Sequence, residues 1–374
     1  MNAHHVVLAL TAASSVLVPD PAGAQAVFSV TPSVATTQVY DSNLFSSSTD
    51  RETDFITRVT PSILSTYRSP IWQLRSRYSF DVERFASHDD LSSGSARRHA
   101  AAEFDYQPSP TLAIRSGADL LTTKTPAELN AGTGLSLTRA SASRISGYAD
   151  LARRTNPLIV TSAQYRFSED RITGGSRVRH HTGTAVVERH TSQRDTVSAT
   201  YRLQHFAFGI SSATSHALNV GWTRGLTPRT AVSIQGGPNV TSGSPSVDLA
   251  VTFRDRASDS ERSVTYARGQ TTVVGLAGLV QTQSLIATVP WGSHRSVTFT
   301  LMPAIYRNEH ASLRADVFRL SLSAVRPVTR SLSLEAVLAA SVQHGNLYTT
   351  LAPPTIPRHE VLVRLVAGLP ATPR

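Results

Sequence analysis

The residues best suited to acid–base chemistry are His88, Asp89 and Asp90, which follow one another directly. A histidine beside a carboxylate can activate a water molecule or a nucleophile. These three residues fall in a short polar segment, and no further catalytic partner can be placed beside them. Side chains in that situation are more often simply solvated. The sequence therefore predicts no catalytic residues and no enzyme.

Two adjacent histidines, His180 and His181, are the next candidates, because imidazole nitrogens bind metal ions. Consecutive residues of an extended strand point to opposite faces, so this pair cannot chelate one ion there. The chain also lacks the Gly-x-Ser-x-Gly, phosphate-loop and His-Glu-x-x-His patterns. We expect neither a metal site nor a cofactor.

Charged side chains are more informative because they alternate with apolar ones. The segment 72–83 carries Trp72, Leu74, Tyr78, Phe80 and Val82 on one face and Gln73, Arg75, Arg77, Ser79, Asp81 and Glu83 on the other. Segments near residues 100, 200, 250, 300 and 320 repeat this pattern. Alternation with a period of two predicts strands that are apolar on one side and charged on the other.

The charged residues on these polar faces are the candidate pore lining: Arg75, Arg77, Asp81, Glu83, Glu103, Asp105, Arg115, Asp119, Arg166, Arg202, Arg254, Arg319 and Glu335. Two interpretations stay open together. Cross-strand ion pairs would stiffen a barrel wall. A charged lining would instead set the ion preference of a channel, and the arginine excess predicts mild anion preference.

Turn signals divide the chain into hairpins. They occupy residues 68–70, 107–110, 154–157, 191–194, 226–229, 257–260, 292–295 and 327–330. Eight such turns between two free ends predict eighteen strands, an even number that suits a closed up-and-down antiparallel barrel. Merging the weak segments 142–156 and 176–188 would give sixteen strands instead.

The connections on the other side are longer and richer in Ser, Gly and Asp. They span residues 41–53, 88–95, 126–141, 169–176 and 241–246. In a membrane barrel they would be surface loops, and the short turns would lie in the periplasm. None is long enough to predict a folded plug.

The first 26 residues resemble a signal peptide, with an apolar stretch from Val6 to Val18 and cleavage expected after Ala24 or Ala26. The alternative is a soluble protein with an apolar N-terminal helix. Residues 27–374 then form the barrel domain. No later apolar run approaches the roughly 18 to 20 residues of a membrane helix. There is no cysteine, so a secreted fold has to be held without disulfides.

The net charge is +10, with 36 basic and 26 acidic residues. The basic residues are almost all arginines, and they are spread over every segment, which argues against a nucleic-acid partner. A soluble β-sandwich or solenoid would also alternate, but its turns usually come every 8 to 12 residues or so. The spacing here is wider, so a membrane barrel is favoured.

The segment 40–45, Tyr-Asp-Ser-Asn-Leu-Phe, resembles the first loop of a family of outer-membrane β-barrel porins found beside exosortase or exopolysaccharide loci. The returning Val-Thr-Pro-Ser at 59–62 and the Tyr-Ala-Arg-Gly at 266–269 are also similar to that family. The residues that carry the motif are Tyr40, Asp41, Asn43, Phe45 and Pro61. Such barrels usually end in an aromatic residue read by the assembly machinery, whereas here Leu369 takes that position.

These observations predict a porin-like barrel in the outer membrane of a Gram-negative-type bacterium. It would pass small hydrophilic or glycan-related solutes passively or semi-specifically. The alternative is a non-conducting barrel that serves an exopolysaccharide-export or surface-anchoring system. The expected partners are outer-membrane lipid, the barrel-assembly machinery and, in the alternative, exopolysaccharide-export components.

Overall fold

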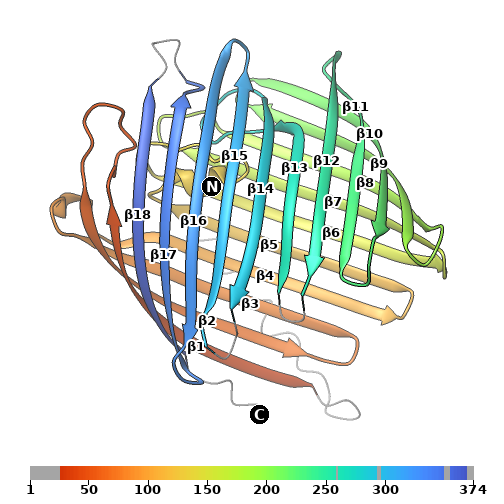
Figure 1. Cartoon of the computed structure of the whole chain (residues 1–374), viewed down its shortest axis with the longest axis horizontal. Coiled ribbons are helices and arrows are strands. Elements are labelled where there is room, and N and C mark those ends of the chain that lie inside the picture. The colour runs from red at the N-terminus through yellow and green to blue at the C-terminus, as the bar shows by residue number, and fades with distance from the viewer. Residues whose placement is uncertain (1–25, 258–259, 293–295, 349–353, 369–374) are drawn as a thin grey trace.

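The computed structural model describes residues 26–257, 260–292, 296–348 and 354–368. They form eighteen antiparallel strands, each hydrogen-bonded to its neighbours in the sequence. The last strand also pairs with the first, so the sheet closes into a barrel (Figure 1). The all-β barrel and the count of eighteen are therefore confirmed, and sixteen is wrong. The expected signal peptide lies almost wholly outside the described residues.

The first nine strands are β1 (Val27–Asp41), β2 (Asp54–Arg68), β3 (Trp72–Phe85), β4 (Ser93–Ser109), β5 (Leu112–Thr123), β6 (Ala142–Asn156), β7 (Ile159–Ile172), β8 (Val178–His190) and β9 (Asp195–Phe208). The others are β10 (Ser211–Gly225), β11 (Thr230–Thr241), β12 (Ser244–Arg256), β13 (Glu261–Thr271), β14 (Val280–Gly292), β15 (Thr298–His310), β16 (Leu313–Pro327), β17 (Leu332–Gly345) and β18 (Thr355–Gly368). Two 3-10 helices, η1 (Asp89–Leu91) and η2 (Pro126–Asn130), lie in connections.

Alternation along each strand separates an apolar exterior from a polar interior. On β10 the residues Leu218, Val220 and Trp222 are exposed, whereas Ala217 and Asn219, which alternate with them, are buried. Residues directly opposite each other in an antiparallel ladder share a face, so the apolar outer face and the polar inner face continue from each strand to the next. Within the described ranges, no helix is long and apolar enough to cross a membrane.

The two ends of the barrel differ. The turn end, where β1 begins and β18 finishes, has connections at the places where the sequence predicts turns; parts of the turns at 257–260 and 292–295 lie outside the described residues. The loop end carries the longer connections, but those after β9, β11 and β15 have only two residues, so the expected loop at 241–246 is wrong. The connection there is a two-residue turn at Ser242 and Gly243, whose φ angles of 48° and 87° suit a tight hairpin.

The seam between β1 and β18 is fastened beside the family-like motif. Asp41 accepts hydrogen bonds from Arg358 of β18 at 3.0 and 2.6 Å. The Asn43 side-chain amide donates to the carbonyls of Pro357 and Ser47. Tyr40 packs against Phe55 with ring centroids 5.1 Å apart. The motif therefore joins the first strand to the last.

Two motif residues lie beside the seam contacts. Phe45 meets the His88 ring edge-on, with centroids 5.7 Å apart. Pro61 lies opposite Val34 in the β1–β2 ladder. Phe45 thus packs two neighbouring loops together, and Pro61 belongs to the first hairpin of the wall. Leu369 lies outside the described residues.

Candidate functional site in the barrel lumen

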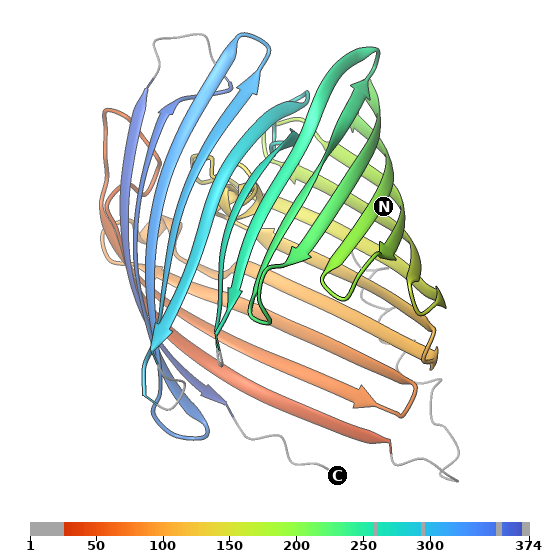
Figure 2. The same cartoon turned by 45° about the vertical axis from the view of Figure 1, so that its right-hand side comes forward.

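The connection between β5 and β6, residues 124–141, folds into the barrel rather than across its surface, and we call it the inner loop (Figure 2). Asn308 of β15 donates from its side-chain amide to the Thr133 carbonyl at 2.9 Å. The Ser136 backbone N–H donates to the Gln343 side chain of β17 at 2.9 Å. Leu129 and Leu135 are buried. The expectation of a surface loop at 126–141 is therefore corrected.

The opposite wall holds the inner loop through charged side chains. Arg139 contacts Glu83 of β3 at 3.0 Å, and its guanidinium lies 4.9 Å from the centre of the Phe85 ring. Arg97 of β4 contacts Glu128 at 2.9 Å. These contacts, with those to β15 and β17, make the inner loop a bridge across the lumen.

Other loop-end connections pack on this bridge. Val273 and Leu347, from the connections after β13 and β17, join Leu135 and Tyr306 in one buried apolar cluster. Gly134 lies against the Tyr306 ring with a φ of 67°, and a Cβ there would come within 2.6 Å of a ring atom. The inner loop is thus fixed by a small apolar core of its own.

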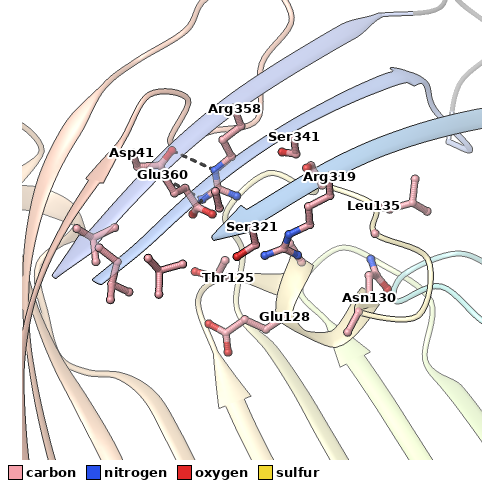
Figure 3. A pocket seen from close by; sticks show the side chains of 18 of the residues that line it. Asp41, Thr125, Glu128, Asn130, Leu135, Arg319, Ser321, Ser341, Arg358 and Glu360 are labelled. Carbon is pink, nitrogen blue, oxygen red and sulfur yellow. Dashed lines mark hydrogen bonds and ion pairs between the residues drawn. The ribbon is translucent and has the colours of Figure 1, made fainter. Parts of the chain in front are cut away.

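A cavity of about 280 Å³ separates the inner loop from the wall formed by β1, β2 and β16–β18. Figure 3 shows Asp41, Arg319, Arg358 and Glu360 on the wall side and Glu128 on the inner loop. A second cavity of about 370 Å³ lies on the other side, between the inner loop and β6–β8. The inner loop therefore divides this level of the lumen in two.

Most carboxylates in and around the first cavity form ion pairs with arginines. Glu83, almost fully buried, contacts both Arg58 and Arg139. Asp41 and Glu360 both contact Arg358, at 2.6 and 2.9 Å. Burial without a cation would be costly for such groups, so these pairs hold the wall together.

Arg319 is different. It lines the same cavity and is exposed within it, and it makes no ion pair or hydrogen bond with any residue of the described ranges. Ser321 and Ser341 are its polar neighbours along the cavity wall (Figure 3). Its guanidinium therefore keeps N–H donors available to a solute.

The structure places every candidate pore-lining residue on the inner face of its strand. Glu83 defines that face, because it contacts the inner loop. Arg75 lies opposite Glu103, and Asp105 lies opposite Arg115, in the antiparallel ladders. Residues opposite each other share a face, so the inner face of β3 continues through β4 to β5. Arg166, Arg202, Arg254, Arg319 and Glu335 fall on the corresponding face of later strands.

Many of these side chains form cross-strand pairs, as one interpretation expected. The pairs are Arg115–Asp105 at 3.3 Å, His99–Asp119 at 2.5 Å, Arg166–Asp150 at 3.9 Å, Arg202–Asp248, Arg254–Glu261 at 3.9 Å and Arg364–Glu335 at 3.4 Å. The pairs Arg115–Asp105 and Arg254–Glu261 are exposed on both sides, so each contributes little by itself, whereas Asp248 is mostly buried. The Arg75 guanidinium lies beside the Gln73 side chain, and neither Arg75 nor Arg77 forms an ion pair within the described part of the chain.

Sequence reasoning missed Arg58, Arg139, Arg358 and Glu360. Arg58, Arg358 and Glu360 fall at every-second positions of the polar faces of β2 and β18, but polar neighbours such as Thr57 and His359 weaken the alternation there. Arg139 lies in a loop without any period, and no local signal indicates its contact with Glu83, 56 residues earlier.

The histidines behave as structural groups. His88 bonds Asp54 and Glu52 at 2.6 and 2.5 Å, across two loop-end connections. His180 stacks on Phe206 inside the barrel, whereas His181 bonds the Tyr165 hydroxyl on the outside. No cluster of three or more metal-binding side chains occurs among the described residues.

A closed eighteen-stranded barrel, apolar outside and polar inside, defines the class: this is an outer-membrane β-barrel of porin-like architecture. No protein-family model and no curated protein matches the chain. Solved structures resemble it in overall shape. OpdQ of Pseudomonas aeruginosa has 10% identity and a TM-score of 0.46, and the match covers 93% of this chain and 98% of that one.

Two further structures have a similar degree of likeness. An anion-selective porin from Comamonas acidovorans has 12% identity and a TM-score of 0.41, with 92% and 100% of the two chains covered. The siderophore receptor PirA of Pseudomonas aeruginosa has 12% identity and a TM-score of 0.45, with 91% and 80% covered.

Proposed function

We propose that this barrel is a passive or semi-specific channel for small hydrophilic solutes, with a preference for anions. The observation that carries the proposal is the cavity beside the inner loop. The carboxylates that line it are paired, Asp41 and Glu360 with Arg358 and Glu128 with Arg97, whereas Arg319 makes no ion pair within the described ranges. A fixed positive charge at a narrow point attracts anions and repels cations. Glycan-related solutes with acidic groups belong to the same class.

Recording from purified protein in a planar bilayer tests the channel. We expect discrete conductance steps, and a KCl gradient should give a reversal potential with the sign of chloride preference. A bilayer that stays sealed after insertion of folded barrels would contradict the proposal, and potassium preference would contradict its anion part.

Arg319→Gln tests the residue that carries the selectivity. Removing one unit charge about 7 Å from a passing ion changes the energy of that ion by about 0.6 kcal/mol in water, with opposite sign for chloride and potassium. The chloride-to-potassium permeability ratio should therefore fall by up to roughly sevenfold at low salt, and by less where salt screens the charge. Arg330→Gln makes the same charge change in a turn outside the lumen and should leave the ratio unchanged. Equal effects of both changes would mean that Arg319 has no special role.

One observation favours the alternative of a non-conducting barrel in an exopolysaccharide-export or anchoring system. The inner loop is bound to both walls and packed by an apolar core, so it occupies much of the lumen at its level. A deletion strain that loses surface polysaccharide while its solute permeability stays unchanged would favour this alternative over the channel.

A further inference from the structure

Three arginines surround one glutamate where β7 and β8 meet the loop end. Arg171 donates to Glu169 Oε1 at 2.7 Å, and Arg179 donates to Oε2 at 3.0 Å. Arg177, from the connection between the two strands, donates to the same Oε2 atom. We call this group the β7–β8 arginine cluster.

The cluster lies on the outside of the barrel. Asp170 and Arg144, which pair at 2.6 Å, face inward, because Arg144 also donates to the Leu129 carbonyl of the inner loop. Glu169 is the neighbour of Asp170 on β7, and Arg179 lies directly opposite Glu169. Successive strand residues point to opposite faces, so Glu169 and Arg179 face outward.

The charges of the cluster do not balance. The Glu169 side chain is only 8% exposed, whereas those of Arg171, Arg177 and Arg179 are 58%, 42% and 46% exposed. One guanidinium is enough to neutralise one carboxylate. The cluster therefore presents a net charge of about +2 and several free N–H donors, which match the oxygens of a phosphate group.

The outer surface beneath the cluster is apolar. Phe167 and Tyr165 follow Glu169 on the same face of β7 in the direction of the turn end, and Ile145 lies opposite Glu169 on β6. Ile145 and Tyr165 are exposed. A charged cluster directly above an apolar and aromatic band sits at the level where hydrocarbon gives way to lipid headgroups.

We propose that the β7–β8 arginine cluster binds the phosphate of an anionic lipid in the leaflet that surrounds the loop end. The lipid's acyl chains would lie along Ile145, Phe167 and Tyr165, and its phosphate would bridge Arg177 and Arg179. In an outer membrane whose loops face outward, that lipid is a phosphorylated glycolipid of the outer leaflet. This site is independent of whether the lumen conducts.

Native mass spectrometry of the full chain in detergent tests the proposal, with diphosphorylated lipid A, phosphatidylcholine and inorganic phosphate as probes. We expect lipid A to bind in preference to phosphatidylcholine. The double variant Arg177→Gln, Arg179→Gln should lose about tenfold or more in lipid A affinity, since each arginine near a lipid surface contributes on the order of 1 kcal/mol.

The matched control is Arg153→Gln with Arg189→Gln, on the outer face of β6 and β8 near the turn end. It removes the same charge and should leave lipid A binding unchanged. Equal losses in both double variants would show only a general charge effect and overturn the site. Retained affinity in the first variant would also overturn it. Displacement of lipid A by an equal concentration of inorganic phosphate would indicate a free-anion site instead.

Discussion

At the residue scale, the contact that matters most to closure is the pair of Asp41 and Arg358. The Asp41 side chain is 1% exposed and that of Arg358 is 11% exposed, and together they join β1 to β18. Removal of the cation leaves a buried carboxylate without its partner. Asp41 of the family-like motif therefore contributes to the stability of the closed barrel.

We expect Arg358→Ala to lower the free energy of unfolding by about 3 to 5 kcal/mol, the usual cost of breaking a buried ion pair. Urea titration of the barrel in detergent measures it. Arg364→Ala on the same strand is the control. Its 3.4 Å contact with Glu335 is about one third exposed on both sides, so about 1 kcal/mol or less should be lost. Equal losses would contradict the role given to Asp41.

A second residue-scale prediction concerns His88, outside the membrane-spanning strands. Hydrogen bonds to Asp54 and then to Glu52 raise the pKa of His88 above its ordinary value near 6.5. A raised pKa stabilises the folded loop pair fully below pH 6.5, and that stabilisation is lost as the pH rises through the folded pKa.

Hydrogen exchange checks this. The backbone N–H groups of Ala86, Ser87 and His88 donate to Asp54. Their protection factors, corrected for the intrinsic pH dependence, should fall on the alkaline side of the His88 titration. In His88→Gln the protection factors should not change with pH over that range. The same pH dependence in the variant would exclude His88 as the cause.

At the element scale, the strands follow from the sequence and the inner loop does not. Alternation within one strand is local, so residues such as Tyr78 and Val82 indicate their faces without knowledge of the partner strand. The inner loop is placed by contacts such as that of Asn308 with Thr133, which are 175 residues apart. No pattern along the chain encodes such a contact, so the divided lumen was not predictable, whereas the charged inner faces were.

Gly134→Val tests whether the inner loop is the constriction. Its left-handed φ and the Tyr306 ring leave no room for a side chain, so strain of roughly 1 to 3 kcal/mol should push the inner loop away from β15–β17. We expect larger single-channel conductance. Gly132→Val is the control, because a Cβ at that position meets nothing within 4 Å. Unchanged conductance in a Gly134→Val barrel that still folds would place the constriction elsewhere.

At the scale of the whole molecule, stability depends on closure, because an open sheet would leave unpaired backbone groups in lipid. Nine residue pairs, from Ser33–Gly368 to Asp41–Glu360, join β1 to β18. Every other strand pair joins neighbours in the sequence. Closure therefore needs all eighteen strands, but it does not need the chain to begin at β1.

A deletion of β1 and a circular permutant test separately whether closure needs all eighteen strands and whether the chain has to begin at β1. Deletion of β1 should abolish the folded, SDS-resistant form that migrates differently before and after boiling, because β2 and β18 would be left as open edges. A circular permutant should keep that form after refolding in detergent. It would link residue 368 to residue 27 with a flexible segment and open in the turn between β8 and β9. Residues 27 and 368 both lie at the turn end, so the link crosses no strand. A folded β1 deletion, or a permutant that cannot refold while the parent does, would show that closure is not what holds the barrel.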